Sequence, residues 1–536
     1  MPSTTSLMLR SALGRVSKHA TSPKQRLLVL CQRGADWAAA WLKTPAGAVA
    51  ALILGTFLAR LLFAGALGLG IDESYMVAAG RKLQLGYFDH PPIAWWLAWG
   101  SAHLTGSESA VVVRLPFIVL FALTTWLMYR VTSALFDPEA GLWAAVVLNL
   151  APVLGVIAGT WVLPDGPLFA ALLGALACLI RALPADGRPA WGWWLATGGC
   201  VGLALCSKYS AALTVLGAVA FLATEPTSRH WLMRPQPYLA GIVALVIFSP
   251  VLIWNAEHGW VSLLFQGGRA GGALHPFGPL MAIGGQAAFL LPWIWFPLVW
   301  CGVVAARRGP SDAKRWLLFC LAAPPILLFT LAELRSNRLF HWAAPGYLML
   351  VPLLGEAIAR RQTSRLVRIW LGATAVFVVL GVVVVASQVR FNWLSGLVAD
   401  SGKKSNLDAA DWISLRTELE TRDLLDKPGL VVAALKWHEA GKIDYALGGR
   451  VPVICLGSDA RQYGLIANPD DYAGADVLIV APRRSFAQID GQFGSLFDAI
   501  EAIAPATITH AGRPLTTLPL FIGHRLRARA GPAGNP

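Results

Sequence analysis

Long apolar runs alternate with short polar breaks along most of this chain, and the pattern predicts a protein made largely of membrane-crossing helices. At about 20 apolar residues per crossing, ~11 spans can be placed before residue 388. They cover residues 45–70, 111–129, 141–160, 167–181, 191–206, 210–223, 238–254, 280–305, 316–334, 343–358 and 369–387. The fifth and sixth spans are separated only by Ser207-Lys208-Tyr209.

Composition supports the same class. Hydrophobic residues make up 56% of the 536 residues and charged residues only 14%, whereas about 25% is usual for soluble domains. The net charge of +14 comes from Lys and Arg in the short breaks, as in the cytoplasmic loops of membrane proteins, so it does not indicate a nucleic-acid partner. Only one of the seven cysteines, Cys455, falls in the polar C-terminal part, which excludes a disulfide within that part.

Three domains follow from these shifts in pattern. Residues 1–43 form a basic tail, residues 44–387 form the membrane part, and residues 388–536 form a separate polar domain. Short β-branched runs in this last part predict strands at 431–435, 451–456 and 477–481, and helices are expected near 408–425 and 492–503. We therefore expect a small α/β domain, with disorder over the Gly- and Pro-rich residues 523–536.

Basic clusters set the predicted orientation. They precede the first span and follow the fourth, sixth, eighth and tenth spans, so all of them fall on one side of the membrane. Positive residues mark the cytoplasmic side, which places the N-terminus inside and the C-terminal domain outside. The Ala-, Arg- and Gly-rich composition suggests a GC-rich bacterium, and so the bacterial inner membrane with the C-terminal domain in the periplasm.

The breaks on the opposite side contain the unusual polar residues. These are Asp72, Glu73, Asp89, His90, Asp165, Lys208, His258, His275, Arg335, Arg338 and His341. Ionisable groups at a membrane boundary are costly to hold and usually mark a functional site. The sequence therefore predicts one site on the outer face.

The residue types at this site suggest group transfer from a phosphate. A carboxylate can deprotonate a hydroxyl or hold a divalent cation, and Lys208, Arg335 and Arg338 can bind an anionic group. The chain has no Gly-rich phosphate loop of the Walker type, and nucleotides are found inside the cell. A lipid-linked phosphate in the outer leaflet therefore fits better as donor than a nucleotide.

Several short motifs in order along the membrane part carry a family resemblance. They are Asp72-Glu73-Ser74-Tyr75, Gly86-Tyr87-Phe88-Asp89-His90-Pro91-Pro92, Arg114-Leu115-Pro116, Pro164-Asp165-Gly166-Pro167, Ser207-Lys208-Tyr209 and, in the polar domain, residues 440–447. This set resembles the bacterial family 39/83 glycosyltransferases of the GT-C class. These include aminoarabinose transferases of lipid A, galacturonosyltransferases and protein O-mannosyltransferases.

The resemblance implies a polyprenyl-phosphate-linked sugar as donor and a lipid, glycan or protein as acceptor. It implies that Asp72, Glu73 and Asp165 are catalytic, and direct displacement would invert the anomeric carbon. Lys208 would bind the donor phosphate, with His90, Tyr75 and Arg338 as further phosphate-binding candidates. Some members have a phosphate-binding Lys at the position of His90 and an Arg at that of Tyr75, so Arg81, Lys82, Arg269 or Arg338 could substitute for them.

The resemblance also implies a possible divalent metal. Some members bind one beside an acid at the position of Asp89 and a histidine from a later outer loop, which here is His258 or His275. Spacing does not choose between the two histidines.

Structural readings of the same residues stay open. Asp72, Glu73 and Asp165 can serve as helix caps, and Lys208 can extend its ammonium to the interface. Arg60, inside the first span, is expected to pair with an acid or a carbonyl. A transporter or lipid flippase, with polar groups near the midplane, is the main alternative function, and a scaffold whose tail binds a partner is a further one.

Overall fold

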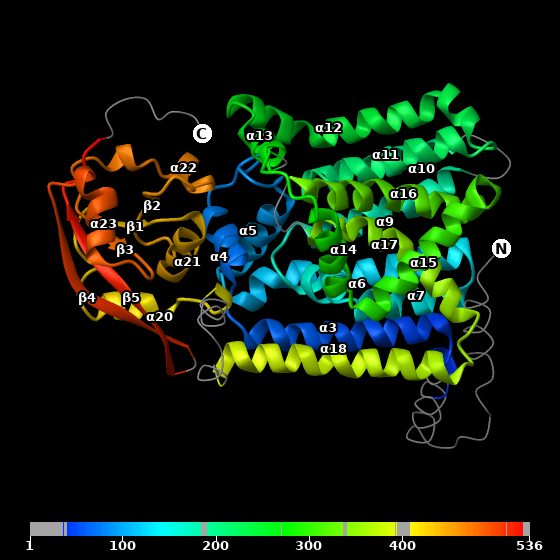
Figure 1. Cartoon of the computed structure of the whole chain (residues 1–536), viewed down its shortest axis with the longest axis horizontal. Helices are drawn as coiled ribbons and strands as arrows, with labels where there is room; N and C mark the ends of the chain where they lie inside the picture. Colours follow the sequence, from blue (N-terminus) through cyan, green and yellow to red (C-terminus); the bar gives the residue numbers. More distant parts are fainter. Residues whose placement is uncertain are drawn as a thin grey trace, which may run out of the picture.

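The protein consists of a long helical part and an α/β domain attached to one end of it (Figure 1). The computed structural model describes residues 36, 40–183, 190–269, 271–335, 340–391, 393, 408–510 and 512–528. Helices fill the chain up to Phe391, and all five strands of the described part lie beyond residue 430.

The prediction of a polytopic helical membrane protein is confirmed. By length and composition, seven helices of the described part can cross a membrane, or up to nine if two bent helix pairs each count as one span. The crossing helices are α3 (Pro45–Ala66), α6 (Ala110–Leu135), α9 (Asp165–Ala182), α12 (Pro235–Glu257), α16 (Ala313–Leu331), α17 (Ala344–Ala359, with η5, Phe340–Ala343) and α18 (Arg365–Phe391). The predicted count of ~11 also included α10 (Trp191–Ser207) and α11 (Ala211–Thr224), which are shorter than these helices.

Two runs predicted as straight crossings are bent. The run at 141–160 divides into α7 (Pro138–Leu150) and η1–α8 (Val153–Thr160) with an angle of 83° between them. The run at 280–305 divides into α14 (Gly278–Leu290) and α15 (Pro292–Arg308), bent by 113°. Pro152 lies at the first break and Pro292 directly after the second. Proline lacks the amide hydrogen and obstructs the preceding turn, which explains why both helices break there.

Small residues allow close contact between the helices. A side-chain carbon at Gly198 of α10 would lie 2.2 Å from the carbonyl oxygen of Ala240 on α12. At Gly355 of α17, it would lie 2.6 Å from the carbonyl oxygen of Ala140 on α7. Such contacts are typical of membrane helices, where association depends on tight packing because lipid is as apolar as the side chains.

Two helices remain at the edge of the bundle. Helices α3 and α18 lie side by side along one flank (Figure 1). Only 11% of the most apolar stretch of each helix is buried. Arg60 of α3 faces inward, where it donates to the Gly155 carbonyl oxygen at 2.9 Å and to Asn149 Oδ1 at 3.2 Å. The prediction that Arg60 pairs with a carbonyl is confirmed.

The C-terminal α/β domain has a five-stranded sheet in the order β2-β1-β3-β5-β4. Its strands are β1 (Val431–Ala434), β2 (Val453–Cys455), β3 (Val477–Val480), β4 (Ala499–His510) and β5 (Arg513–His524), and its helices are α20 (Ser414–Glu420), α21 (Trp437–Leu447), α22 (Gln462–Ile466) and α23 (Phe486–Phe493). β1 pairs in parallel with β2 and β3, whereas β5 runs antiparallel to β3 and β4.

Two predictions for this domain were wrong. The helix expected at 492–503 ends at Phe493 in α23, and residues from Ala499 onward form strand β4. β4 lies at the edge of the sheet and has a register shift between Ile503 and Ala506, where Pro505 stands. An edge strand tolerates a residue without an amide hydrogen, and pairing with β5 outweighs the local preference for a helix. The disorder predicted over residues 523–536 is also contradicted at its start, because Gly523 and His524 belong to strand β5 and pair with its neighbours. Residues 529–536 lie outside the described residues.

The α/β domain docks on the helical part through α21 and α4 (Ile71–Ala79). Gly441 permits this contact, because a side-chain carbon there would lie 2.6 Å from Cα of Tyr75. The Lys442 ammonium is buried and donates to the carbonyl oxygens of Leu69 and Ala410. The docked interface therefore includes the helix on which the first acidic motif lies.

Candidate active site

Helix α4 places the two acidic residues of the first motif in different surroundings. Both lie in its first turn, where carboxylates interact favourably with the helix dipole. Glu73 points inward and is buried. Its carboxylate forms a two-bond ion pair with Arg114, at 2.8 and 2.6 Å, and accepts from the amides of Gly70 and Val162. Burial alone would raise the pKa of Glu73, but Arg114 and these amides outweigh it and hold the pKa below its usual value.

The Asp72 carboxylate, unlike that of Glu73, is not paired within the described residues. It makes no hydrogen bond or ion pair with any residue that the structure describes. Its oxygens can be reached by solvent, yet the group lies deep among surrounding protein atoms. This loss of bulk water, with Asp89 nearby as a further negative charge, raises the pKa of Asp72 to about 6. A carboxyl with that pKa can accept a proton near neutral pH.

Asp89 and His90 follow α4 in the loop before α5 (Ile93–Thr105). Asp89 is buried; its Oδ2 pairs with Arg461 Nη1 at 2.9 Å, and Tyr75 Oη lies 3.4 Å from its Oδ1. Burial lowers the pKa of His90 to about 4, so its imidazole is neutral at physiological pH. The buried Nδ1 atom of His90 has no hydrogen-bond partner.

Asp165 and Lys208 form a further ion pair of the site. The Lys208 ammonium contacts both carboxylate oxygens of Asp165, at 2.9 and 3.0 Å, and lies 5.3 Å from the ring centre of Trp342. The guanidinium of Arg269 lies 5.0 Å from the centre of the same ring, and His341 interacts electrostatically with this group. Two cations therefore share one indole, an arrangement that aromatic faces favour.

Unpartnered polar atoms gather at the same place. Among the described residues, buried atoms without a hydrogen bond include His90 Nδ1, Gln266 Oε1 and Arg269 Nε. Gln266 Nε2 donates to the backbone carbonyl of Asp89 at 2.5 Å, and Arg269 and Arg461 both lie over Phe265. Buried polar groups are normally satisfied, so this group of unpartnered atoms indicates space for a polar ligand.

The residues predicted to bind a metal have other contacts in the structure. His258 Nδ1 lies 2.8 Å from the backbone carbonyl oxygen of Trp254, and its ring stacks on that tryptophan. The backbone amide of His275 donates to the Leu334 carbonyl. Within the described ranges, no three His, Cys, Asp or Glu side chains are arranged to hold a metal ion. Asp89 is instead neutralised by Arg461.

The other predicted cations have different locations. Arg81 forms ion pairs with Glu108 and Asp444, both at 2.6 Å, and Lys82 donates to the Ile466 carbonyl on the exposed surface. Arg335 is exposed. Arg338 lies outside the described residues. Of the alternatives for phosphate binding that the structure describes, Arg269 is the one beside Lys208.

Sequence reasoning missed Arg461, Gln266 and Trp342 as site residues. Arg461 pairs with an acid 372 residues away, and no local pattern marks it. Gln266 begins the Gly-rich stretch 266–272, which resembles no phosphate loop. Trp342 follows His341 and resembles an ordinary interfacial anchor.

Comparisons with known proteins agree with this architecture. A family model described as dolichyl-phosphate-mannose-protein mannosyltransferase matches residues 89–254. The lipid A galacturonosyltransferase RgtD of Rhizobium johnstonii is 24% identical over 289 residues, which are 52% of this chain and 58% of that protein. The match thus spans less than two thirds of this curated relative.

Two solved structures share the fold. ArnT from Cupriavidus metallidurans in the apo state gives a TM-score of 0.62 at 15% identity, covering 89% of this chain and 98% of that one. ArnT bound to undecaprenyl phosphate gives 0.59 at 16% identity, covering 89% and 97%. The protein has the ArnT-type GT-C fold. The family model and the curated relative are both described as glycosyltransferases, and the chain shares the fold of ArnT.

Proposed function

We propose that the protein transfers one sugar from a polyprenyl-phosphate donor to a lipid, glycan or protein acceptor at the outer face of the bacterial inner membrane. The observation that carries this proposal is that Arg269 interacts electrostatically with Asp72 and shares the Trp342 ring with Lys208, among buried polar atoms that lack hydrogen-bond partners in the described part. A base and two cations are what displacement of a phosphate requires.

Asp72 is the proposed general base. Its carboxylate accepts the proton of an acceptor hydroxyl or amine while that oxygen or nitrogen attacks the anomeric carbon. The bond between this carbon and the phosphate oxygen breaks, and the polyprenyl phosphate leaves with the electron pair. A single displacement of this kind inverts the anomeric configuration, so retention in the product would contradict it.

Lys208 and Arg269 are the proposed phosphate ligands. Asp165 holds the Lys208 ammonium, and Trp342 lies beneath both cations. Charge-assisted hydrogen bonds to phosphate are among the strongest in proteins. The neutral His90 can donate one further hydrogen bond from its ring, although burial disfavours a charged imidazole there.

Two predicted site residues are reassigned in this proposal. Glu73 is occupied by Arg114 and two amides. The Tyr75 hydroxyl is buried, contacts Asp89 and accepts from the Gln462 amide. We propose that both residues support the site and that neither contacts the donor.

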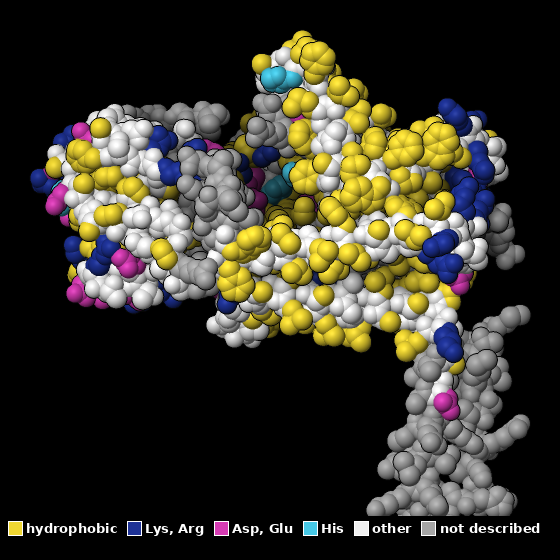
Figure 2. Space-filling view, turned by 60° about the horizontal axis from the view of Figure 1, so that its bottom comes forward, with side chains coloured by type: hydrophobic (Ala, Val, Ile, Leu, Met, Phe, Trp, Pro, Cys, Tyr) yellow, Lys and Arg dark blue, Asp and Glu magenta, His cyan; other side chains and the backbone are white. Residues whose placement is uncertain are grey.

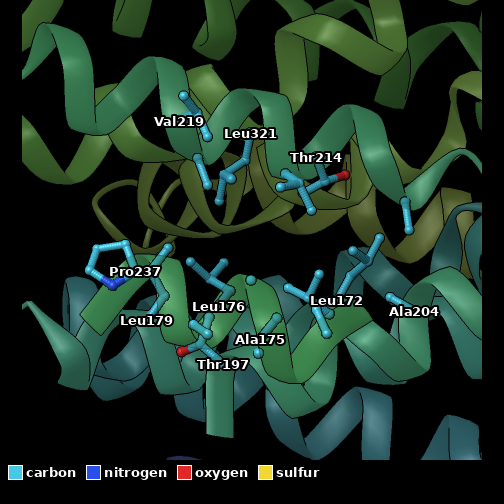
Figure 3. A pocket seen from close by; sticks show the side chains of 18 of the residues that line it. Leu172, Ala175, Leu176, Leu179, Thr197, Ala204, Thr214, Val219, Pro237 and Leu321 are labelled. Carbon is cyan, nitrogen blue, oxygen red and sulfur yellow. The ribbon is translucent and has the colours of Figure 1, made fainter. Parts of the chain in front are cut away.

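An apolar slot lies within the helical bundle (Figure 3). It runs between α9, α10 and α12 on one side and α11 and α16 on the other. Ala204 and Ala211 lie at the ends of α10 and α11 that flank Lys208. The cavity measures about 140 Å³, and its lining is apolar apart from Trp194, Thr197 and Thr214. The slot is separate from the acidic residues, so we propose it for the isoprenoid chain of the donor and not for the reaction.

The distribution of charge supports an outward-facing site. Figure 2 shows Lys and Arg gathered at the end of the helical part remote from the α/β domain. Positive residues concentrate on the cytoplasmic side, which would place the site and the α/β domain outside. The ionisable groups of the site lie at the end of the helical part next to the α/β domain. A transporter would instead bind its substrate near the middle of the bundle.

The test is transfer by the purified protein in lipid nanodiscs supplied with polyprenyl-phosphate sugars and an extract of envelope acceptors. Mass spectrometry should show one sugar mass added by the wild type and none by Asp72→Asn. Asp490→Asn, an exposed acid of the α/β domain, is the matched control. No transfer by the wild type with any donor, or equal transfer by Asp72→Asn, would overturn the proposal.

A further inference from the structure

We propose that the α/β domain contributes a positioning residue, Arg461, which fixes Asp89 and helix α13 (Val261–Gly268) beside the catalytic carboxylate. This inference rests on the proposed function, because it assigns Asp72 as the base. It extends that function by making transfer depend on a docked α/β domain.

Arg461 lies at the junction of three segments. Its guanidinium pairs with Asp89 of the α4–α5 loop at 2.9 Å, lies 5.2 Å from the ring centre of Phe265 on α13, and lies 3.9 Å from the ring centre of Trp437 on α21. Asp459 is its second acidic partner, at 3.4 Å. The side chain is 17% exposed, so solvent screens these contacts only partly.

Helix α13 is held against the same group of residues. Phe265 packs on Phe88, with ring centres 5.0 Å apart, and Gln266 donates to the backbone carbonyl of Asp89. Arg269, the proposed phosphate ligand, follows directly after this helix and lies over Phe265 as well. A loss of the Arg461 contacts would therefore release the segment that carries Arg269.

The backbone around Arg461 is built for this contact. Arg461 has a φ of 45°, which non-glycine residues seldom adopt and which often marks functional positions. The next residue, Gln462, fastens the turn to the helical part: its amide donates to the Tyr75 hydroxyl at 3.2 Å, and its Oε1 accepts from the Phe88 amide at 2.8 Å. The turn that carries Arg461 is thus joined to the helical part by two hydrogen bonds of Gln462.

The pairing explains how the charge of Asp89 is balanced. The carboxylate predicted to bind a metal faces Arg461, so the compensating cation comes from the α/β domain. The same positive charge acts on Asp72, whose other charged neighbours include Asp89, Glu73, Lys442 and Arg269.

The experiment compares Arg461→Gln and Arg461→Lys with Arg450→Gln in the full-length protein. Arg450 belongs to the same domain but forms only an exposed pair with Glu420. The first readout is hydrogen–deuterium exchange over residues 261–268. Arg461→Gln should speed exchange in these residues, whereas Arg461→Lys should remain close to the wild type and Arg450→Gln should equal it.

The second readout is transfer of the sugar. In Arg461→Gln, kcat should fall at least tenfold, and the acidic limb of the pH profile should move to higher pH because a positive charge near Asp72 is lost. Arg461→Lys should return the acidic limb of the pH profile to its wild-type position. A purely structural role of Arg461 would lower activity without shifting this limb.

The two failures can be told apart. A wild type that transfers no sugar would refute the proposed function, and the exchange measurement would still test whether Arg461 holds α13. Wild-type exchange over residues 261–268 in Arg461→Gln would overturn the inference, as would an unchanged pH profile in an active Arg461→Gln protein.

Discussion

Two clusters of buried charge meet at helix α4, and they differ in how completely their members are paired. In the first, the carboxylate of Glu73 is matched by Arg114 and two amides, and Arg114 also donates to three backbone carbonyls. In the second, Asp72 is unpaired among the described residues, and three buried polar atoms there, His90 Nδ1, Gln266 Oε1 and Arg269 Nε, lack hydrogen-bond partners. A satisfied network stabilises one structure, whereas an unsatisfied one leaves places for a ligand. The comparison separates residues that hold the site from residues that act in it.

The sharpest test of this division is Asp72→Asn. It removes the proposed base while keeping the size of the side chain, so transfer should fall by about 10²–10⁴-fold. The midpoint of thermal unfolding should stay the same or rise at pH 7.5, because ionised Asp72 is disfavoured by its surroundings. A drop in unfolding temperature that matches the loss of activity would place Asp72 with the structural cluster.

Arg114→Ala should produce the opposite outcome. It leaves the buried Glu73 carboxylate without its cation, at a cost of about 3–5 kcal/mol in stability. The unfolding temperature in detergent should fall strongly, and activity should be lost together with the fold. Arg130→Ala, an exposed position on the same helix, is the control and should unfold like the wild type. Normal stability of Arg114→Ala would contradict the satisfied-network interpretation.

Lys208→Ala tests the phosphate side of the unsatisfied cluster. A charged hydrogen bond to phosphate contributes about 1.5–3 kcal/mol, so the KM for the donor should rise about 10–100-fold. Lys208→Arg should recover part of this loss. If KM stays constant, Lys208 serves only as the partner of Asp165.

The pH dependence of transfer should follow Asp72. Its pKa is raised to about 6, so the base is protonated and inactive below that pH and ionised above it. Transfer should therefore increase with pH through about 6 and fall about tenfold for each unit below it. His90→Gln should keep this limb, because burial lowers the pKa of His90 to about 4 and its imidazole is already neutral. An acidic limb that shifts in His90→Gln would assign the titration to the histidine.

The smallest effect is expected in the apolar slot. Ala175→Phe would fill part of it from α9. The KM for a donor with a full-length polyprenyl chain should rise a few-fold, whereas a donor with two or three isoprene units should bind as before. An equal effect on both donors would place the isoprenoid chain elsewhere.

The sequence predicted the class of fold and much of the candidate site, for a physical reason. Apolar runs must be long enough to cross lipid, and costly ionisable residues stand out between them. Asp72, Asp165 and Lys208 were found in this way, and the structure brings Asp165 and Lys208 into contact. The predicted metal site, Asp89 with His258 or His275, stays a prediction, because spacing along the chain does not report which side chains of distant loops converge.

The sequence by itself determined that this is a membrane protein and that ionisable residues occur in the breaks between spans on one predicted side of the membrane. Both follow from the sequence because hydropathy and charge are local properties of the chain. Only the tertiary structure decided which of two adjacent acids is free: Glu73 is occupied because α6 brings Arg114 to it. Only tertiary structure could bring Arg461 to Asp89 across 372 residues. Pairing of buried charges depends on the packing of separate elements, and that packing is fixed by contacts that no local pattern records.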